Sequence, residues 1–410
     1  MDQRPAQQKK VYFYTGSFTH TFYKEQFLCP PAGFEYLPSS AELLNLHGIR
    51  KDIIQSRHRL YPYKQYLSQV VLGLLISLRI PKIRRVSSPE CDLIHSAQYP
   101  LLNRQPWVID FEDVSAFTWY SPKVLRSPLA RKILENIFAS PSCQAILPWT
   151  EAARKSLENA LDCQKFREKI KVVYPTITPQ KKDEVEKYFA ARQSAKKIKL
   201  LFVGTAFLMK GGLETLIVLD RLSKRYEVEG AIVSNVPAEY AEKYKGHPAI
   251  RFYSKVSNEE LKKLYQTSHL FLAPYHTDTF GFVILEAFSY GLPCLGTDQF
   301  AIPEIVTDGQ TGRVVTNSAS RFNQRFLPVC EPIIKEGSPL LEMVKNPPSD
   351  YLERLETALE SLIKDRQVLE KMGRNAYAEV VSGRFSAREH QNSLMPIYQQ
   401  ATSGMRQKNG

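Results

Sequence analysis

The sequence predicts an α/β protein built from two domains, each with a parallel sheet. The chain has 410 residues, and a single hydrophobic core seldom grows beyond about 250–300 residues, so two cores are expected. Short apolar runs of strand type alternate with helical stretches in both halves, which is the pattern of parallel strands joined by helices. We predict a first domain over residues 1–180 and a second over 199–383, joined by a charged helical connection.

The first half opens with a strand that runs into a Gly16-Ser17 turn. Helical character dominates residues 41–46, 53–80 and 132–138, with breaks at Gly48 and Pro62. The expected strands of this half are Lys10–Thr15, Cys91–Ser96, Trp107–Val114, Gln144–Pro148 and Lys171–Pro175.

The second half repeats the alternation of strands and helices. Its expected strands are Leu200–Val203, Glu229–Ser234, Ile250–Tyr253, Leu270–Ala273, Pro293–Gly296 and Gly312–Val315. Residues 316–350 are rich in Pro, Ser and Asn and are interpreted as an insertion, and Tyr351–Met372 as one helix. Neither half contains a Gly-x-Gly-x-x-Gly run or a Walker sequence, which argues against dinucleotide enzymes and phosphate-loop ATPases.

The most informative stretch runs from Asp278 to Glu286 and sets two carboxylates eight residues apart around a Phe-Gly turn. Residues 283–290 read as a helix stopped by Gly291 and Pro293, so backbone N–H groups near Gly281 can approach a phosphate. Carboxylates in such a place can accept strong hydrogen bonds from sugar hydroxyls. The alternative is an ordinary loop and helix with solvated acids.

This stretch resembles the donor-sugar motif of the family-four retaining glycosyltransferases, an acid followed by seven residues and Glu. Here the first acid is Asp278 where the family has Glu, which shortens its reach by one methylene. Residues 199–217 resemble the family's first donor-domain strand, phosphate loop and helix, with Thr205 where the family has Arg. Lys210 then remains as the main cation for the donor diphosphate, unless it is only a surface lysine at a helix start.

The resemblance implies the GT-B fold, two Rossmann-like domains facing across a cleft, with a final helix over 384–402 packing back on the first domain. It implies that Asp278 meets the sugar hydroxyls and Glu286 the ribose. It implies no bound metal, and the eight histidines show no metal-ligand spacing. The donor-binding set carried over from the family is Gly16, Gly204, Thr205, Lys210, Lys255, Val256, Asp278, Phe280, Gly281, Phe282 and Glu286.

Two of these assignments have plain alternatives. Lys255 and Val256, where the family receives the nucleotide base, precede a capping pattern of Ser257 and Glu260 and can equally mark only a helix start. Gly16 is nearly as well explained as a turn glycine.

On the acceptor side, the family's His-Asp pair is replaced by Glu112-Asp113, which with Asp110 makes three acids in four residues. One of them could position or deprotonate the acceptor hydroxyl, although a carboxylate is a weak base unless its pKa is tuned. The alternative is that these acids cap the following turn. The candidate catalytic residues are therefore Asp278, Lys210, Glu112 and Asp113.

The net charge is +13, from 55 Lys and Arg against 42 Asp and Glu, and residues 51–85 carry eight cations against one anion. This basic stretch includes an apolar run over 70–80, which suits either adsorption to anionic lipid or a core helix with a basic edge. No nucleic-acid-binding signature accompanies the charge, so a nucleic acid is the least favoured partner. With no apolar targeting segment and no membrane-spanning run, we expect a cytoplasmic protein, peripheral to the membrane if the stretch binds lipid.

We therefore expect a retaining glycosyltransferase that moves a sugar from a nucleotide-sugar donor to a hydroxyl acceptor, such as a glycan or lipid-linked glycan. The departures at Thr205 and Asp278 leave open a non-catalytic nucleotide-sugar-binding protein. An epimerase of the same fold, which would need an acid/base pair and no acceptor, is a third hypothesis.

Overall fold

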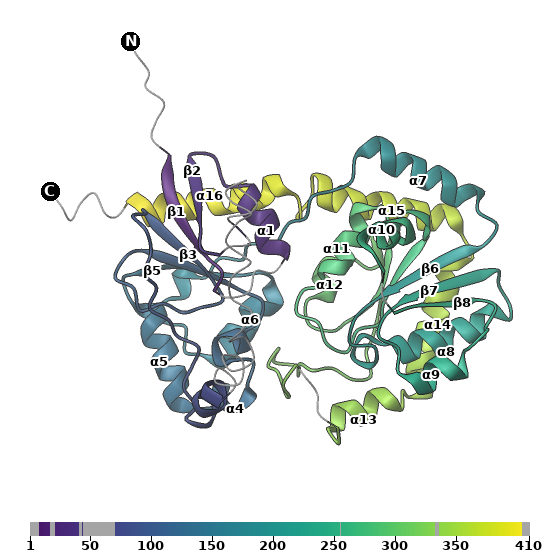
Figure 1. The fold of residues 1–410 in the computed structure, drawn as a ribbon, viewed down its shortest axis with the longest axis horizontal. Helices are drawn as coiled ribbons and strands as arrows, with labels where there is room; N and C mark the ends of the chain where they lie inside the picture. Colours follow the sequence, from purple (N-terminus) through teal and green to yellow (C-terminus); the bar gives the residue numbers. More distant parts are fainter. Residues whose placement is uncertain are drawn as a thin grey trace, which may run out of the picture. The chain divides into compact units, whose positions relative to one another are not determined.

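A computed structural model describes residues 8–16, 21–40, 43, 70–254, 256–332 and 336–403. It divides the chain into two compact units (Figure 1). Unit 1 comprises Met1–Thr176, Gln324–Glu331 and Arg388–Gly410, and unit 2 comprises Ile177–Asn323 and Pro332–Ala387. Each unit holds one parallel sheet with helices, so the predicted α/β class with two Rossmann-like domains is confirmed.

The sheet of unit 1 has five strands in the order β2-β1-β3-β4-β5, and all neighbours are parallel. The strands are β1 (Lys9–Tyr14), β2 (Phe34–Pro38), β3 (Leu93–Ala97), β4 (Trp107–Phe111) and β5 (Cys143–Pro148). Every residue of β3 and β4 is buried, including the polar residues His95, Ser96 and Asp110. The edge strand β2 was not predicted.

The predicted strand over Lys171–Pro175 is not a strand in the structure. The N–H groups of Lys171 and Val173 donate to the carbonyls of Ile146 and Pro148, both at 3.0 Å, so the segment runs beside β5. These two hydrogen bonds do not continue into the regular pattern of a β-strand, and the chain then leaves the sheet.

Helices cover the sheet of unit 1. They are α1 (Thr21–Leu28), η3 (Val114–Thr118), α4 (Pro122–Leu125), α5 (Pro128–Ala139), α6 (Glu151–Ala160), η4 (Arg167–Lys169) and α16 (Ala387–Ser403). Residues 70–77 also form a helix, within the predicted helical stretch 53–80, most of which lies outside the described residues, as does nearly all of 41–46. Ser127 and Thr150 cap α5 and α6 by accepting hydrogen bonds from the N–H groups of Ala130 and Ala153.

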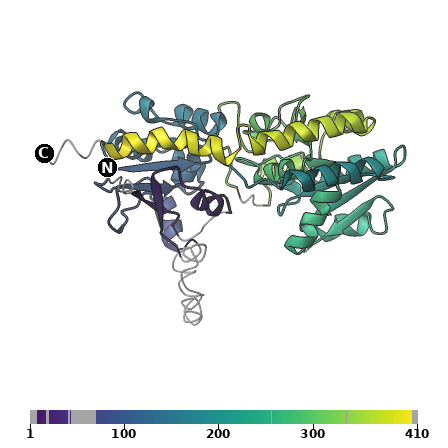
Figure 2. The same ribbon diagram turned by 90° about the horizontal axis from the view of Figure 1, so that it is seen from above.

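The C-terminal helix α16 lies along unit 1 (Figure 2). Its Tyr398 is fully buried, and its hydroxyl lies 3.0 Å from the hydroxyl of Tyr36 and 2.5 Å from Nδ1 of His95. The other ring nitrogen of His95 lies 2.9 Å from Asp110, which also accepts a 2.6 Å hydrogen bond from Tyr23. This buried polar chain ties α16 to strands β2, β3 and β4.

The sheet of unit 2 has six parallel strands in the order β11-β10-β9-β6-β7-β8. They are β6 (Ile198–Val203), β7 (Val228–Val233), β8 (Ile250–Tyr253), β9 (Leu270–Ala273), β10 (Cys294–Thr297) and β11 (Gly312–Val315). All six strands predicted for this half are confirmed. The strand order reverses direction at β6, between β9 and β7, which is where ligands bind in sheets of this kind.

The helices of unit 2 are α7 (Lys182–Ser194), η5 (Leu208–Lys210), α8 (Gly212–Ser223), α9 (Ala238–Lys243), α10 (Asn258–Thr267), α11 (Phe282–Ser289), α12 (Ile302–Ile305), α13 (Pro339–Lys345), α14 (Ser349–Ile363) and α15 (Arg366–Val381). The single helix predicted over Tyr351–Met372 is wrong, because Asp365 caps the N-terminus of α15 through the N–H groups of Gln367 and Val368. The predicted insertion is not one loop either. Its Gln324–Glu331 segment belongs to unit 1, and α13 follows it.

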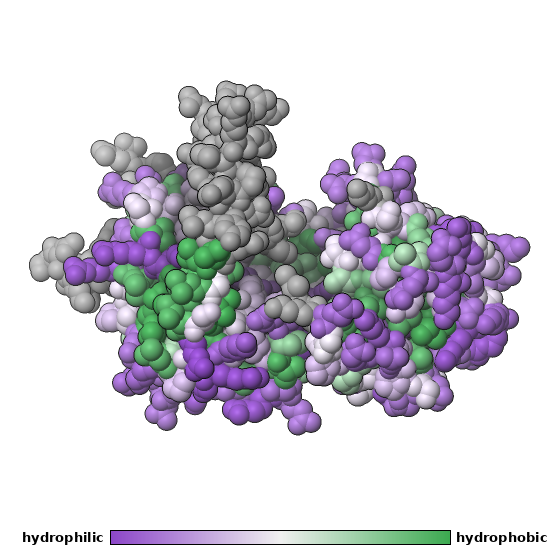
Figure 3. Space-filling view, turned by 60° about the horizontal axis from the view of Figure 1, so that its bottom comes forward, coloured by the Kyte–Doolittle hydropathy of each residue, from purple (hydrophilic) through white to green (hydrophobic). Residues whose placement is uncertain are grey.

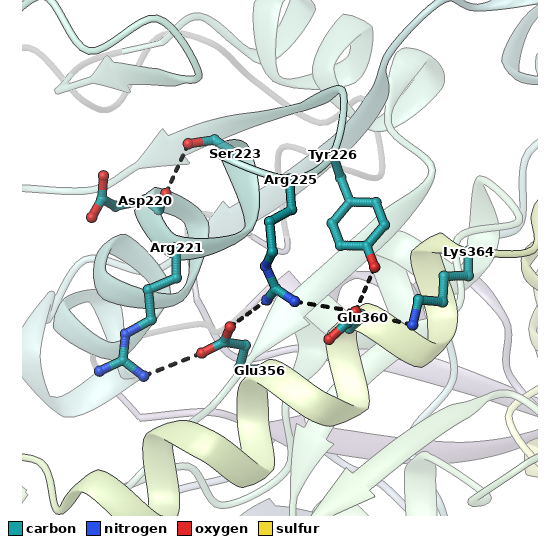
Figure 4. A network of polar contacts seen from close by, with 8 residues as sticks. All are labelled: Asp220, Arg221, Ser223, Arg225, Tyr226, Glu356, Glu360 and Lys364. Atoms are coloured by element: carbon teal, nitrogen blue, oxygen red, sulfur yellow. Dashed lines mark hydrogen bonds and ion pairs between the residues drawn. The ribbon is translucent and has the colours of Figure 1, made fainter.

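A surface network joins α8 to α14 in unit 2 (Figure 4). Glu356 pairs with Arg221 and Arg225, and Glu360 pairs with Arg225 and Lys364 and accepts a hydrogen bond from Tyr226. These acids recur one helical turn apart on α14, so they face the same neighbour. Within the described part of the chain, no helix has both the length and the apolarity that spanning a membrane requires.

Candidate functional site

Two loops of unit 2 bring Lys210 and Asp278 together. Lys210 ends η5 after strand β6, and Asp278 follows strand β9, the direct neighbour of β6 in the sheet. The Nζ atom of Lys210 lies 2.5 Å from Oδ2 of Asp278 and donates to the carbonyl of Thr277 at 2.9 Å. The two side chains are 21% and 14% exposed, so the pair is reachable from solvent. The structure thus places both residues at the carboxyl end of the sheet, as the sequence predicts.

The backbone around Asp278 holds the loop in place without a ligand. Oδ1 of Asp278 accepts from the N–H of Phe280 at 3.1 Å, and the side-chain amide of Gln299 donates to the Asp278 carbonyl at 3.0 Å. The N–H groups of His276 and Thr277 both donate to the carbonyl of Met209, which ties this loop to the Lys210 loop. The carboxylate is therefore positioned by two segments rather than by one.

Tyr275 lies at the centre of the site and was missed in the sequence. The ammonium of Lys210 lies 4.6 Å from the centroid of its ring, and its hydroxyl donates to the carbonyl of Val203 at 3.1 Å. Burial raises the pKa of Tyr275 well above its usual value, and the negative charges of Asp278 and Glu286 raise it further. Tyr275 thus lies within electrostatic range of both acids of the motif. Its place just after a buried strand was the only available signal.

Glu286 projects from α11, which begins after Gly281 in a left-handed conformation with φ of 87°. One carboxylate oxygen accepts a 3.0 Å hydrogen bond from the hydroxyl of Tyr265, whose ring stacks on Tyr290 at 5.1 Å. Burial raises the pKa of Glu286, and the bond from Tyr265 opposes that rise only in part. The acid is therefore held by an aromatic pair from the neighbouring helix α10 and the end of α11.

Two glycines shape the Lys210 loop. A Cβ added to Gly204 would lie 2.9 Å from both Cβ and Cγ of Lys210, so the lysine stem passes directly over this glycine. Gly211 has φ of 71°, and a Cβ there would lie 2.1 Å from the carbonyl oxygen of Pro274. Gly211 was not among the predicted site residues. Thr205, in the place of the family's arginine, is exposed.

A buried acid–base pair lies under the same loops. Nε2 of His276 lies 2.7 Å from Glu214 on α8, and neither side chain is exposed to solvent. Burial alone would lower the pKa of His276, but the hydrogen bond and charge of Glu214 raise it overall. Since its Nδ1 lies 3.0 Å from the carbonyl of Ala319, His276 anchors the loop that carries Asp278. No group of His, Cys, Asp and Glu in the described ranges is arranged to hold a metal ion.

The remaining predicted donor residues have mixed placements. Phe280 is buried against Phe282, with ring centroids 4.6 Å apart, so only its backbone faces Asp278. Val256 is half-buried and precedes α10, whose predicted capping box is confirmed by reciprocal bonds between Ser257 and Glu260. Lys255 lies outside the described residues.

In unit 1, the three acids after β4 have different partners. Asp113 is 0% exposed and caps η3, accepting from both the N–H and the hydroxyl of Ser115. The alternative that the acids cap the following turn therefore describes Asp113 in this structure, and its catalytic role stays a prediction. Asp110 is buried in the Tyr398 network. Glu112 is half-buried and accepts a hydrogen bond from Tyr120.

Gly16 lies in the turn that follows β1 in unit 1, with φ of 70°, a conformation that favours glycine. An added Cβ would lie 2.8 Å from the ring of Tyr99, so this turn also lets an aromatic side chain approach closely. Gly16, Tyr99 and Glu112 follow strands β1, β3 and β4, which places all three at the carboxyl edge of the unit 1 sheet.

Part of unit 2 is similar to a known protein family. Residues 184–328 match the model of the glycosyl transferases group 1 family. The chain is 30% identical over 162 residues to an uncharacterized 41.2 kDa protein in the cps region of Klebsiella pneumoniae, covering 38% of this chain and 44% of that protein. It is 34% identical over 98 residues to the sulfoquinovosyl transferase SQD2 of Arabidopsis thaliana, covering 23% and 18% of the two chains. The matched part spans less than half the length of these relatives.

Solved structures share the fold over nearly the whole chain. Alr3699/HepE of Anabaena, in complex with UDP and glucose, has a TM-score of 0.57 at 15% identity, covering 95% of this chain and 99% of that one. A glycosyltransferase from Rickettsia africae ESF-5 has a TM-score of 0.59 at 11% identity, covering 97% and 99%. The fold is thus that of the GT-B proteins, and residues 184–328 are similar to the glycosyl transferases group 1 family.

Proposed function

We propose that this protein is a retaining glycosyltransferase that moves a sugar from a nucleotide-sugar donor to a hydroxyl acceptor. The observation that carries the proposal is the ion pair of Lys210 and Asp278 beside the ring of Tyr275, inside the segment that matches the family and also contains Glu286. A cation beside two acids suits a ligand that is a diphosphate at one end and a set of hydroxyls at the other. Retention is taken from the family resemblance.

Lys210 would neutralise the charge that develops on the departing diphosphate. The N-terminal end of α11 at Gly281 and the N–H groups of the Gly204 loop would add partial positive charge. Preorganised charges of this kind usually contribute most to catalysis, because they need no rearrangement when the bond breaks. Asp278 would bind the sugar hydroxyls and Glu286 those of the ribose, through charge-assisted hydrogen bonds.

The acceptor hydroxyl would meet Glu112 in unit 1, since Asp113 is committed to its cap. Metal independence stays a prediction from the family, and unchanged turnover in excess EDTA would support it.

A panel of nucleotide sugars tests the proposal in two steps. Thermal shift identifies the donor, because a ligand at 100 times its Kd stabilises the folded state by about 2.7 kcal/mol. Turnover is then followed as released nucleoside diphosphate with candidate acceptors. Lys210→Met should abolish release, while Lys245→Met serves as a matched control, because Lys245 is an exposed lysine that pairs only with Glu242.

The products separate the competing hypotheses. A non-catalytic binding protein would show a thermal shift with a nucleotide sugar but would release no nucleoside diphosphate with any of the acceptors. An epimerase would return an altered nucleotide sugar with no acceptor present. Either result would overturn the proposal of glycosyl transfer.

We also propose that unit 1 adsorbs to anionic membranes. Val70, Val71, Leu74 and Leu78 are 51%, 47%, 57% and 58% exposed, and their spacing puts Val70, Val71 and Leu74 on one side of the helix over 70–77. The exposed Arg79 and Arg85 follow this helix. Figure 3 shows hydrophobic residues gathered on the face of unit 1 that this view presents. The rest of the basic stretch, residues 51–69, lies outside the described residues.

Vesicle sedimentation tests the membrane proposal. Binding should rise with the fraction of anionic lipid and fall with salt, since each cation near such a surface contributes about 1 kcal/mol. Leu74→Glu should weaken binding, and Leu129→Glu is the control, because Leu129 is also exposed, at 67%, on a different helix. Equal binding to neutral and anionic vesicles would refute the proposal.

A further inference from the structure

Lys82 in unit 1 is a buried cation that forms no ion pair with any residue that the structure describes. Its side chain is 8% exposed, and its N–H donates to the carbonyl of Phe117 at 2.7 Å, which fixes its backbone. Its ammonium lies 4.0 Å from the centroid of the Tyr99 ring. Among the residues that the structure describes, none forms a hydrogen bond or an ion pair with this ammonium. Buried charges are normally paired, so this one needs an explanation.

The electrostatic setting agrees with an unsatisfied ammonium. Burial lowers the pKa of Lys82 to about 8, the charge of Arg84 lowers it further, and only Glu112 opposes these effects. An anion placed beside Lys82 would reverse the shift, because an opposite charge at close range favours the charged form of a lysine.

Arg84 supplies a second cation against the same ring. Its guanidinium lies 5.8 Å from the centroid of Tyr99 and 5.4 Å from that of Trp119. Its backbone is fixed on both sides, since its N–H donates to Pro100 and its carbonyl accepts from Leu102. The side chain is exposed and has no ion pair in the described part of the chain.

The walls around these cations are held in unusual backbone conformations. Gln98, Trp119 and Tyr120 have φ of 61°, 59° and 58°, although none is glycine. Left-handed conformations of such residues are strained, and they persist mainly at binding and active sites. The hydroxyl of Tyr120 lies 2.8 Å from Oε1 of Gln98 and contacts Glu112, so the loops after β3 and β4 are joined at this point.

We propose that Lys82 and Arg84, over the Tyr99 ring, bind an anionic group of the acceptor, while Glu112 receives a neighbouring hydroxyl. This inference rests on the proposed glycosyl transfer for the identity of the ligand as acceptor, but the anion site itself does not. A carboxylate or a phosphate would satisfy the two cations equally. The acceptor class is therefore an anionic glycan, bearing either a uronic-acid carboxylate or a phosphate ester.

Amine labelling tests the anion site without turnover. The whole protein is acetylated at pH 8 with an N-hydroxysuccinimide ester, and labelling of Lys82 is followed by peptide mass spectrometry. Inorganic phosphate, glucuronate and neutral glucose are compared at equal ionic strength. A bound anion that raises the pKa by one unit should slow labelling roughly fivefold, because at pH 8 the neutral fraction of an amine with a pKa of about 8 falls from about one half to about one eleventh. Protection of Lys82 by glucuronate but not by phosphate would indicate a carboxylate on the acceptor. Protection by phosphate but not by glucuronate would indicate a phosphate. Lys245, exposed and paired with Glu242, should not respond.

Equal protection by glucose, or equal protection of Lys245, would overturn the inference. So would unchanged labelling of Lys82 in all three solutes. Because no donor is present, these outcomes are independent of whether glycosyl transfer occurs.

Kinetics with charged and neutral acceptors provide the second test. Lys82→Met should raise KM for the charged acceptor by roughly thirtyfold relative to its neutral analogue, and Lys82→Arg should restore much of the loss. Thermal shift with the donor should be the same in both variants and the wild type, which shows that unit 2 is intact. A KM that rises equally for both acceptors would refute charge recognition. No transfer by the wild type would refute the proposed function and leave the labelling result to decide the anion site.

Discussion

Replacing Gly211 by alanine should destabilise unit 2 and disturb the proposed donor site together. Gly211 has φ of 71°, and Gly246 in the same unit has the same φ. A Cβ at Gly246 meets nothing within 4 Å, whereas one at Gly211 lies 2.1 Å from the Pro274 carbonyl oxygen. The pair therefore separates backbone strain from steric overlap.

The strain of a left-handed alanine is about 1–2 kcal/mol and should be common to both variants. Overlap with a backbone atom should add about 1–3 kcal/mol for Gly211→Ala alone, because Pro274 follows the buried strand β9 and has little freedom to move. We expect losses of roughly 2–5 kcal/mol at Gly211 and 1–2 kcal/mol at Gly246 in the free energy of unfolding. Urea unfolding, followed by far-ultraviolet circular dichroism, measures the free energy of unfolding of both variants.

The same variant should weaken donor binding, since Gly211 directly follows Lys210. Gly246→Ala should leave donor affinity unchanged. Equal losses of stability in the two variants would refute the steric argument. A destabilised Gly211→Ala that binds donor normally would show that the position of Lys210 does not depend on this turn.

Four further predictions concern buried and surface acids. Glu286→Gln should weaken donor binding about 10- to 150-fold, as expected for a lost charged hydrogen bond, measured by titration calorimetry. Burial raises the pKa of Glu286 in the folded state, so the stability that this group gives the wild type is lost as the pH rises through that pKa. The free energy of unfolding of Glu286→Gln, relative to that of the wild type, should therefore increase from pH 4 to pH 7. A difference that does not change with pH would contradict this. Asp110→Ala should lower the free energy of unfolding, measured with urea, by about 3 kcal/mol or more, because His95 and Tyr23 lose this buried partner. The control Asp92→Ala removes only an exposed hydrogen bond from the Lys10 N–H and should cost under about 1 kcal/mol. The pKa of Glu360 is lowered to about 2 by the hydrogen bonds of Tyr226 and Lys364, so its stabilising effect should be present above about pH 4.5 and lost towards pH 2, and Glu360→Gln should remove that part of the acid dependence.

Strands β9 and β10 of unit 2 were predictable because they are buried on both faces. β9 and β10 are buried at every position, and such strands give continuous apolar runs between turns. β2 was missed for the opposite reason. It is an edge strand with an exposed Glu35 and a terminal Pro38, and a strand of that composition cannot be distinguished from a loop.

Site residues were predictable only where a local sequence pattern identifies them. Asp278 and Glu286 stand in one motif, and Lys210 follows a predicted strand. Tyr265 and Tyr275 gain their roles from contacts with residues that are distant in the sequence, which no local pattern encodes. The acids after β4 show the converse problem. Three carboxylates in four residues look alike in the sequence, yet the fold buries Asp113 in a cap and leaves Glu112 partly exposed.

The ion pair of Lys210 and Asp278 gives the proposed donor site a built-in order of events. The lysine charge is paired with the acid that is expected to hold the sugar. A diphosphate carries more negative charge than one carboxylate, so it should draw the ammonium away from Asp278. The Lys210 stem passes over Gly204, where no side chain stands against it, whereas Asp278 is held by the N–H of Phe280 and by Gln299. The freed carboxylate oxygen then becomes available to the sugar hydroxyls, so that binding of the diphosphate prepares recognition of the sugar.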